Sequence, residues 1–85
     1  MYAVFMTRDA IKALRRLPRK HAAAIRAKIG RVARDPYAPN ANLGPLHGRP
    51  GFRLRAGDWR VIYELDDARR IMTILAIGPR GGVYR

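Results

Sequence analysis

The spacing of the hydrophobic residues changes once along this chain, and that change limits its possible folds more than any other feature of the sequence. In residues 10–34 the apolar side chains recur with the period of an amphipathic helix. From residue 52 onward they alternate with polar residues, which is the period of a strand. The sequence therefore predicts helices in the first half of the chain and a sheet built mainly from the second half.

Pro18 separates two predicted helices. Thr7 is placed to cap the first helix, and Asp35-Pro36 ends the second at residue 34. Their apolar stripes consist of Ala10, Ile11, Leu14 and Leu17 in the first helix and of Ala22, Ile25, Ile29 and Val32 in the second. Because basic residues occupy the opposite sides, we predict a helical hairpin that packs through these stripes and exposes two basic faces.

Four strands are expected around this hairpin, at residues 2–6 before it and at residues 52–55, 59–65 and 70–77 after it. The last of them is apolar on both faces, which is typical of a central strand. Residues 35–50 are rich in Pro, Gly and Asn and are predicted to form one long connection, attached to the body by Leu43 and Leu46. We therefore expect a single α+β domain over residues 1–85: a two-helix hairpin packed on one face of a four-stranded, mostly antiparallel sheet, in the order β-α-α-β-β-β.

The charge of the chain indicates an anionic partner. Eighteen Lys and Arg residues oppose six Asp and Glu residues, which gives a formal net charge of +12 over 85 residues. All of the cations except Lys12, Lys20 and Lys28 are arginines, whose planar guanidinium group suits bidentate contact with phosphate. A positive field of this size requires a polyanion or an acidic protein to neutralise it.

Several classes of site are missing from the sequence pattern. The absence of cysteine excludes disulfides and is compatible with a reducing cytosol. There are no paired carboxylates, no metal-spaced His cluster, no Ser-His-Asp set and no phosphate-binding glycine pattern, so we expect no metal and no cofactor. We expect His21 to be an exposed helix residue and His47 to be structural.

The sequence gives no sign of membrane association or export. The longest apolar stretch, residues 71–77, is too short to cross a bilayer. The opening MYAVFMTRDA lacks the charged-then-apolar order of a signal peptide. We therefore expect a soluble cytoplasmic protein that makes no contact with a membrane.

Arginines on the predicted strands are the residues best placed for chemistry. Arg53 and Arg55 alternate with apolar residues in one strand, and Arg60 does so in the next. If Phe52 and Trp59 both face the helices, all three arginines share the uncovered face of the sheet. Several cations that close together require an anion between them.

Other charged residues are open to two interpretations. The helix cations are either a solvated face or part of an RNA-binding surface, and we assign Lys20, Arg31 and Arg34 to the RNA-binding set. Glu64 lies on the same predicted face as Arg60, and we expect it to form an ion pair that orients a strand, with a general-base role as the alternative.

The order of these pieces resembles the RelE/ParE toxin superfamily. FRLRAGDWRVIYEL at residues 52–65, followed by ILAIGPRGGVYR at residues 74–85, is similar to the superfamily's Arg-rich strand, Gly-Asp-aromatic-Arg turn, Val-Ile-Tyr strand and terminal Arg–Tyr pair. YAVFMT at the start, KALRRLP at the end of the first helix and LHG before the strand also fit. The resemblance covers essentially the whole chain and implies the RelE-like microbial RNase fold.

The resemblance also implies a function and a set of site residues. RelE-like members are ribosome-dependent endoribonucleases, whereas ParE-like members inhibit DNA gyrase and are not enzymes. Arg80 and Tyr84 match the tail pair that belongs to the RelE-like active site, and Arg60 matches the arginine that contacts the scissile phosphate. Arg53 and Arg55 match basic positions on the preceding strand. Many relatives have a His just before the terminal Arg, where this chain has Pro79.

These matches lead us to expect the toxin of a type II toxin–antitoxin system, an endoribonuclease that cuts mRNA in the ribosomal decoding site. Cleavage would use the RNA's own 2′-hydroxyl, without a metal ion, and would leave a 2′,3′-cyclic phosphate. The expected partners are the ribosome, mRNA and a cognate acidic antitoxin, with operator DNA bound only through the toxin–antitoxin complex. The alternatives are a ParE-like gyrase inhibitor and a non-catalytic RNA-binding module.

Overall fold

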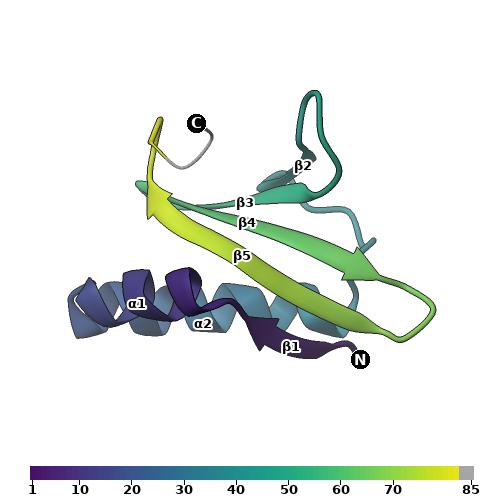
Figure 1. The fold of residues 1–85 in the computed structure, drawn as a ribbon, viewed down its shortest axis with the longest axis horizontal. Coiled ribbons are helices and arrows are strands. Elements are labelled where there is room, and N and C mark those ends of the chain that lie inside the picture. The colour runs from purple at the N-terminus through teal and green to yellow at the C-terminus, as the bar shows by residue number, and fades with distance from the viewer. Residues whose placement is uncertain (83–85) are drawn as a thin grey trace.

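The structure is a computed structural model, and it describes residues 1–82. Two helices cover one face of a five-stranded sheet, and no helix within residues 1–82 covers the other face (Figure 1). The elements are β1 (Ala3–Met6), α1 (Arg8–Arg16), α2 (Arg19–Arg34), β2 (Leu43–Pro45), β3 (Phe52–Ala56), β4 (Trp59–Asp66) and β5 (Ile71–Pro79). The predicted α+β class and the helical hairpin are confirmed.

The helices begin and end where the sequence predicts. The Thr7 side chain accepts a hydrogen bond from the Ala10 backbone N–H at 3.2 Å, which satisfies one of the free donors at the start of α1. Pro18 follows α1 and stands as the N-cap residue of α2, and Asp35 ends α2 before Pro36. The fixed backbone angle of proline therefore sets the bend of the hairpin.

The number of strands is the part of the fold that the sequence prediction missed. Residues 43–45, placed in the predicted long connection, form the edge strand β2 and pair antiparallel with β3. Three residues are too few to show an alternating pattern, and Gly44 and Pro45 read as turn residues. An edge strand tolerates proline because its outer N–H groups need no partner. Leu43 packs against the core, as the sequence analysis expected.

The sheet has the order β1-β5-β4-β3-β2. β1 is parallel to β5, and the other neighbours are antiparallel. β5 lies between β1 and β4, so its predicted central position is confirmed. Apolar residues of β3, β4 and β5, among them Leu54, Val61 and Ile74, pack against Ile25 and Ile29 of α2. One face of the sheet is thereby buried, and the alternate residues of β3 and β4 are directed to the open face.

A cluster of Tyr2, Tyr37 and Asp67, called here the tyrosine–aspartate cluster, ties three distant segments together. The Tyr2 hydroxyl donates to one carboxylate oxygen of Asp67 at 2.7 Å, and the Tyr37 hydroxyl donates to the other at 2.6 Å. These hydrogen bonds lower the pKa of Asp67 below its usual value and raise the pKa of Tyr37 to about 12. The cluster joins the N-terminus, the segment after α2 and the β4–β5 turn.

Candidate functional site

Three arginines meet on the face of the sheet that the helices leave uncovered. Arg53 and Arg55 on β3 and Arg60 on β4 line an open hollow of about 220 Å³, called here the arginine groove. Arg55 and Arg60 are direct cross-strand partners. Phe52 and Trp59 pack against the core on the helix side, so the alternation of the strands directs the arginines to the opposite face.

Arg60 is held in place by the backbone of the β3–β4 turn. Its Nη1 donates to the carbonyl oxygens of Gly57 at 2.8 Å and Trp59 at 2.9 Å. Gly57 has a positive φ of 61°, which glycine adopts without strain and which allows the tight turn. The other guanidinium nitrogens of Arg60 have no protein partner within residues 1–82. The turn therefore fixes a cation whose remaining donors are free to bind a ligand.

No acidic group within residues 1–82 neutralises the charges in the arginine groove. Within residues 1–82 the ion pair is between Arg69 and Asp66, and it lies at the far end of β4. Like charges directly opposite each other on neighbouring strands destabilise a sheet. The Arg55–Arg60 pair is therefore an arrangement that an anion would stabilise.

Glu64 forms no ion pair within residues 1–82, with Arg60 or with any other cation, so the ion pair predicted for it was wrong. Both residues belong to β4, but four residues of strand separate them by about 13 Å along the chain. A shared face does not bring side chains into contact at that distance. Glu64 is exposed, and within residues 1–82 no carboxylate lines the arginine groove.

Arg80 lies beside the same turn but does not line the arginine groove. Its backbone N–H donates to the Asp58 carbonyl oxygen at 2.9 Å, while Gly78 and Pro79 pair with Arg60 and Trp59. The Arg80 side chain is exposed. The structure thus places Arg80 next to the β3–β4 turn. Tyr84, the other predicted tail residue, lies outside the described residues.

The helix cations are not gathered at the groove. Lys20, Arg31 and Arg34 are exposed on α2, which packs on the opposite side of the sheet (Figure 1). His21 is also exposed on α2, and its ring lies 6.2 Å from that of Trp59. His47 is exposed in the segment between β2 and β3. The chain therefore has one compact set of cations on the sheet and a separate set on α2.

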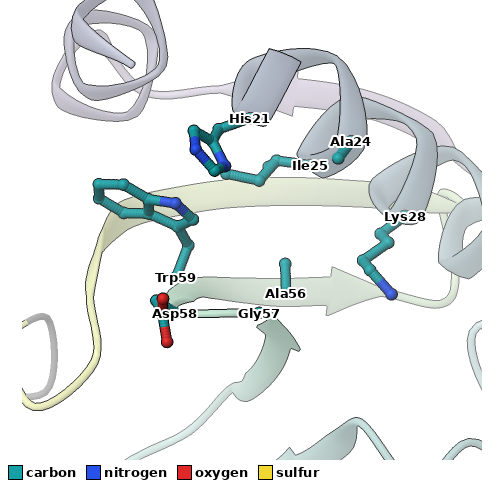
Figure 2. A pocket seen from close by; sticks show the side chains of 8 residues that line it. All are labelled: His21, Ala24, Ile25, Lys28, Ala56, Gly57, Asp58 and Trp59. Atoms are coloured by element: carbon teal, nitrogen blue, oxygen red, sulfur yellow. The ribbon is translucent and has the colours of Figure 1, made fainter. Parts of the chain in front are cut away.

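A second hollow, which the sequence analysis missed, lies on the helix side of the β3–β4 turn (Figure 2). Its volume is about 330 Å³. The side chains around it include Ile25, Lys28 and Ala56, with Asp58 and Trp59 at the turn. It could have been anticipated only from the alternation that places Trp59 opposite Arg60. The turn thus separates an arginine groove on one face from a largely apolar hollow on the other.

Two further features of residues 1–82 bear on the kind of site. No three His, Cys, Asp or Glu side chains of this part of the chain are close enough to hold a metal ion. No helix described in the structure is both long and apolar enough to cross a membrane.

The chain is similar to known toxins along nearly its whole length. The sequence model of the family described as "ParE toxin of type II toxin-antitoxin system, parDE" matches residues 4–84. Toxin RelE of Mycobacterium tuberculosis is 36% identical, over 99% of this chain and 87% of that protein. Toxin RelG of the same organism is 33% identical, over 99% of this chain and 97% of that protein.

The fold is similar to that of solved toxins. The RelE–RelB complex of Pyrococcus horikoshii contains a chain that superposes with a TM-score of 0.81 at 28% identity, over 95% of this chain and 97% of that chain. Together with the family match, these similarities show to which family the protein belongs. The chain belongs to the ParE toxin family and is a RelE-like toxin of a type II toxin–antitoxin system.

Proposed function

We propose that this toxin is an endoribonuclease that cuts mRNA on the ribosome and holds the RNA backbone in the arginine groove. The observation that carries the proposal is the groove itself. Arg53, Arg55 and Arg60 line one hollow on an open sheet face, and no acid pairs with them within residues 1–82. Guanidinium groups bind phosphate in bidentate geometry, so a phosphodiester backbone is the anion that fits best.

The chemistry follows from what three cations can supply. Attack by the RNA's own 2′-hydroxyl places extra negative charge on the phosphorus-bound oxygens in the transition state. Arg60, already fixed by the Gly57 and Trp59 carbonyls, is preorganised to stabilise that charge. Arg55, its cross-strand partner, is placed to share it. This reaction calls on no metal ion and leaves a 2′,3′-cyclic phosphate.

Cleavage also moves two protons: the 2′-hydroxyl loses one as it attacks phosphorus, and the 5′-oxygen gains one as its bond to phosphorus breaks. We assign these transfers to residues near the tail. Arg80 is anchored through its backbone to the β3–β4 turn, and we assign to its side chain the role of aiding the departure of the 5′-oxygen as leaving group. We assign Tyr84 to base stacking or proton relay, as the family resemblance implies. Arginine is a poor proton acceptor, and Pro79 supplies no base. Rate enhancement in this toxin would therefore rest mainly on positioning and charge, with the ribosome assisting.

The cations on α2 are suited to binding ribosomal RNA while the arginine groove holds the mRNA. Lys20, Arg31 and Arg34 are exposed and lie on the other side of the molecule from the groove. A toxin that works inside an RNA-lined cavity meets phosphates on several sides at once. We assign these three residues to contacts with ribosomal RNA, and we place the protein in the cytoplasm.

The proposed protein partner is a cognate acidic antitoxin. The similar RelE of Pyrococcus horikoshii was solved in complex with RelB. An antitoxin here would neutralise part of the +12 charge and cover the arginine groove or the tail. Operator DNA would then be bound only through the toxin–antitoxin complex.

The second candidate is inhibition of DNA gyrase, and the family match favours it because its description names a ParE toxin. The experiment that separates the two is brief induction followed by primer-extension mapping of mRNA 5′-ends and measurement of DNA breaks. We expect new ends inside translated codons, lost in Arg60→Ala and kept in the matched control Arg69→Ala. Intact mRNA with gyrase-linked DNA breaks would instead support the ParE-like function.

A further inference from the structure

The Arg53 side chain lies over Gly44 of the edge strand β2, in space that a side chain at position 44 would fill. An ideal Cβ added to Gly44 would lie 2.7 Å from Nη2 of Arg53 and 2.8 Å from both Cζ and Nη1. Contacts under 3.0 Å are essentially never made by real Cβ atoms, so any side chain at position 44 would displace the guanidinium. The nearly equal distances show that the guanidinium plane faces Gly44.

The backbone of Gly44 does not itself require glycine. The glycines with positive φ are Gly48, Gly51, Gly57 and Gly81. Gly44 is not among them and lies in an ordinary strand, paired with Arg53 across β2 and β3. Alanine would therefore fit the backbone at position 44, and the three atoms nearest to its Cβ would all belong to the Arg53 side chain. Because those atoms are the end of a flexible side chain, the substitution moves Arg53 without straining the sheet.

Packing over Gly44 is what places the Arg53 side chain. Within residues 1–82, no hydrogen bond or ion pair involves its guanidinium, whereas Arg60 is bound by two carbonyls. The N–H groups of Arg53 therefore remain free for a ligand. The cations of the arginine groove also extend over three adjacent strands, from Arg60 on β4 through Arg55 on β3 to the Arg53 guanidinium above β2.

We propose that Gly44 is a positioning residue of the arginine groove: its missing side chain lets the Arg53 guanidinium lie across β2 and bind a phosphodiester next to the one held by Arg55 and Arg60. This inference rests on the proposed RNA-cutting function and names one determinant of how that site holds its substrate. Gly44 touches no RNA itself and acts through Arg53.

The test is a double-mutant cycle between Gly44→Ala and Arg53→Ala, read as affinity for a short single-stranded RNA at fixed salt. We expect Gly44→Ala to lower the affinity about tenfold, close to the effect of Arg53→Ala, since one charge-assisted contact is lost in each. In the Arg53→Ala background, Gly44→Ala should change nothing further. Gly30→Ala is the matched control, because a Cβ there meets no atom within 4 Å beyond the nearby backbone of its own helix.

Two readouts separate positioning from folding. The Tm of Gly44→Ala should not fall below that of the parent, because alanine suits a strand better than glycine does, and the NMR resonance of the Arg53 Nε–H should shift because the guanidinium has moved. If Gly44→Ala weakened RNA binding equally with and without Arg53, the residue would have a structural role and the proposal would be wrong. Parent-like affinity and an unshifted resonance in Gly44→Ala would also overturn it.

Failure of the Gly44 inference can be told apart from failure of the proposed endoribonuclease function. If the parent binds RNA but leaves ribosome-bound mRNA intact, the endoribonuclease proposal fails while the cycle still reports on Gly44. If the parent cuts mRNA and Gly44→Ala cuts it at the same rate and with the same KM, the positioning inference alone fails. A raised KM with unchanged kcat is the result that we expect.

Discussion

The two turns at the ends of β4 handle charge in opposite ways. At the β3–β4 turn, Arg55 and Arg60 face each other, and no carboxylate pairs with them within residues 1–82. At the β4–β5 turn, Asp67 accepts hydrogen bonds from two tyrosines, and Asp66 pairs with Arg69 at 3.9 Å. One end of the strand leaves its charges unsatisfied, and the other end satisfies them internally.

The difference shows how a small domain can separate stability from function. The tyrosine–aspartate cluster connects segments that are 65 and 30 residues apart, so it closes large loops of the chain. The arginine groove makes no such connection and places like charges together at a cost to stability. We interpret the first end as an anchor of the fold and the second as a surface kept ready for an anion.

The largest expected effect is that of Arg60→Ala on activity. Loss of one preorganised cation at the transition state should lower the cleavage rate on ribosomes about 10²–10³-fold. The thermal midpoint should stay close to that of the parent, because the loss of two hydrogen bonds to the turn is offset by the relief of repulsion with Arg55. Arg69→Ala, at the opposite turn, should keep parent activity. Equal rates for Arg60→Ala and the parent would show that the groove is not the site.

RNA binding should depend steeply on salt. The logarithm of the binding constant for a single strand falls with the logarithm of salt by about 0.7 for each phosphate neutralised. Removing one contact in Arg55→Ala should therefore reduce the slope by about 0.7, measured by titration at several salt concentrations. Arg69→Ala should leave the slope unchanged. If the RNA affinity of the parent did not change with salt concentration, the positive charge would be needed only for binding the antitoxin.

The anchoring end should give the fold a defined pH dependence. The pKa of Asp67 is lowered in the folded protein by its hydrogen bonds from Tyr37 and Tyr2. The contribution of Asp67 to the free energy of unfolding is therefore present above its pKa in the unfolded chain. That contribution is lost as the pH falls through its pKa in the folded protein. The pKa of Tyr37 is raised to about 12, so its contribution is present below 10 and lost as pH rises from 10 through 12.

Asp67→Asn should therefore lower the Tm at neutral pH and flatten the acid side of the stability profile. Thermal unfolding at several pH values would measure both effects. Glu64→Gln is the matched control, because Glu64 is exposed and makes no ion pair within residues 1–82. If both substitutions changed the acid profile equally, the tyrosine–aspartate cluster would not be the anchor.

Arg55→Thr in the arginine groove should have the smallest effect, a slight gain in the stability of the folded protein. Replacing Arg55 by Thr removes one of two opposed cations and introduces a residue that suits strands. The free energy of unfolding should rise by about 0.2–1 kcal/mol, while cleavage falls. Denaturant unfolding at low salt would detect the gain. A loss of stability would mean that the Arg55–Arg60 pair is not repulsive in the free protein.

Local patterns account for what was predictable from the sequence. The helix period and the Thr7 cap located the hairpin, and the two-residue period of β3 and β4 brought Arg53, Arg55 and Arg60 to one face. The family resemblance placed Arg80 near this face. These features depend on neighbours a few residues apart, so the sequence carries their signal directly.

What was missed depends on distant contacts. β2 is too short to show a period, and its pairing with β3 decides that it is a strand. The hydrogen bonds of Tyr2 and Tyr37 to Asp67 have no local signature. The ion pair predicted for Glu64 failed because alternation reports the face of a residue and not its distance from a partner along the strand. Gly44 reads as a turn residue until its position opposite Arg53 is known.

The central claim is that the arginine groove promotes attack by a 2′-hydroxyl of mRNA. The most direct measurement uses ribosomes programmed with an mRNA that carries a single 2′-deoxynucleotide at the mapped cut site, with product ends analysed. We expect the parent toxin to cut the all-ribose mRNA to a 2′,3′-cyclic phosphate and to leave the deoxy-substituted position intact. Cleavage of the deoxy-substituted position at the same rate would contradict the central claim.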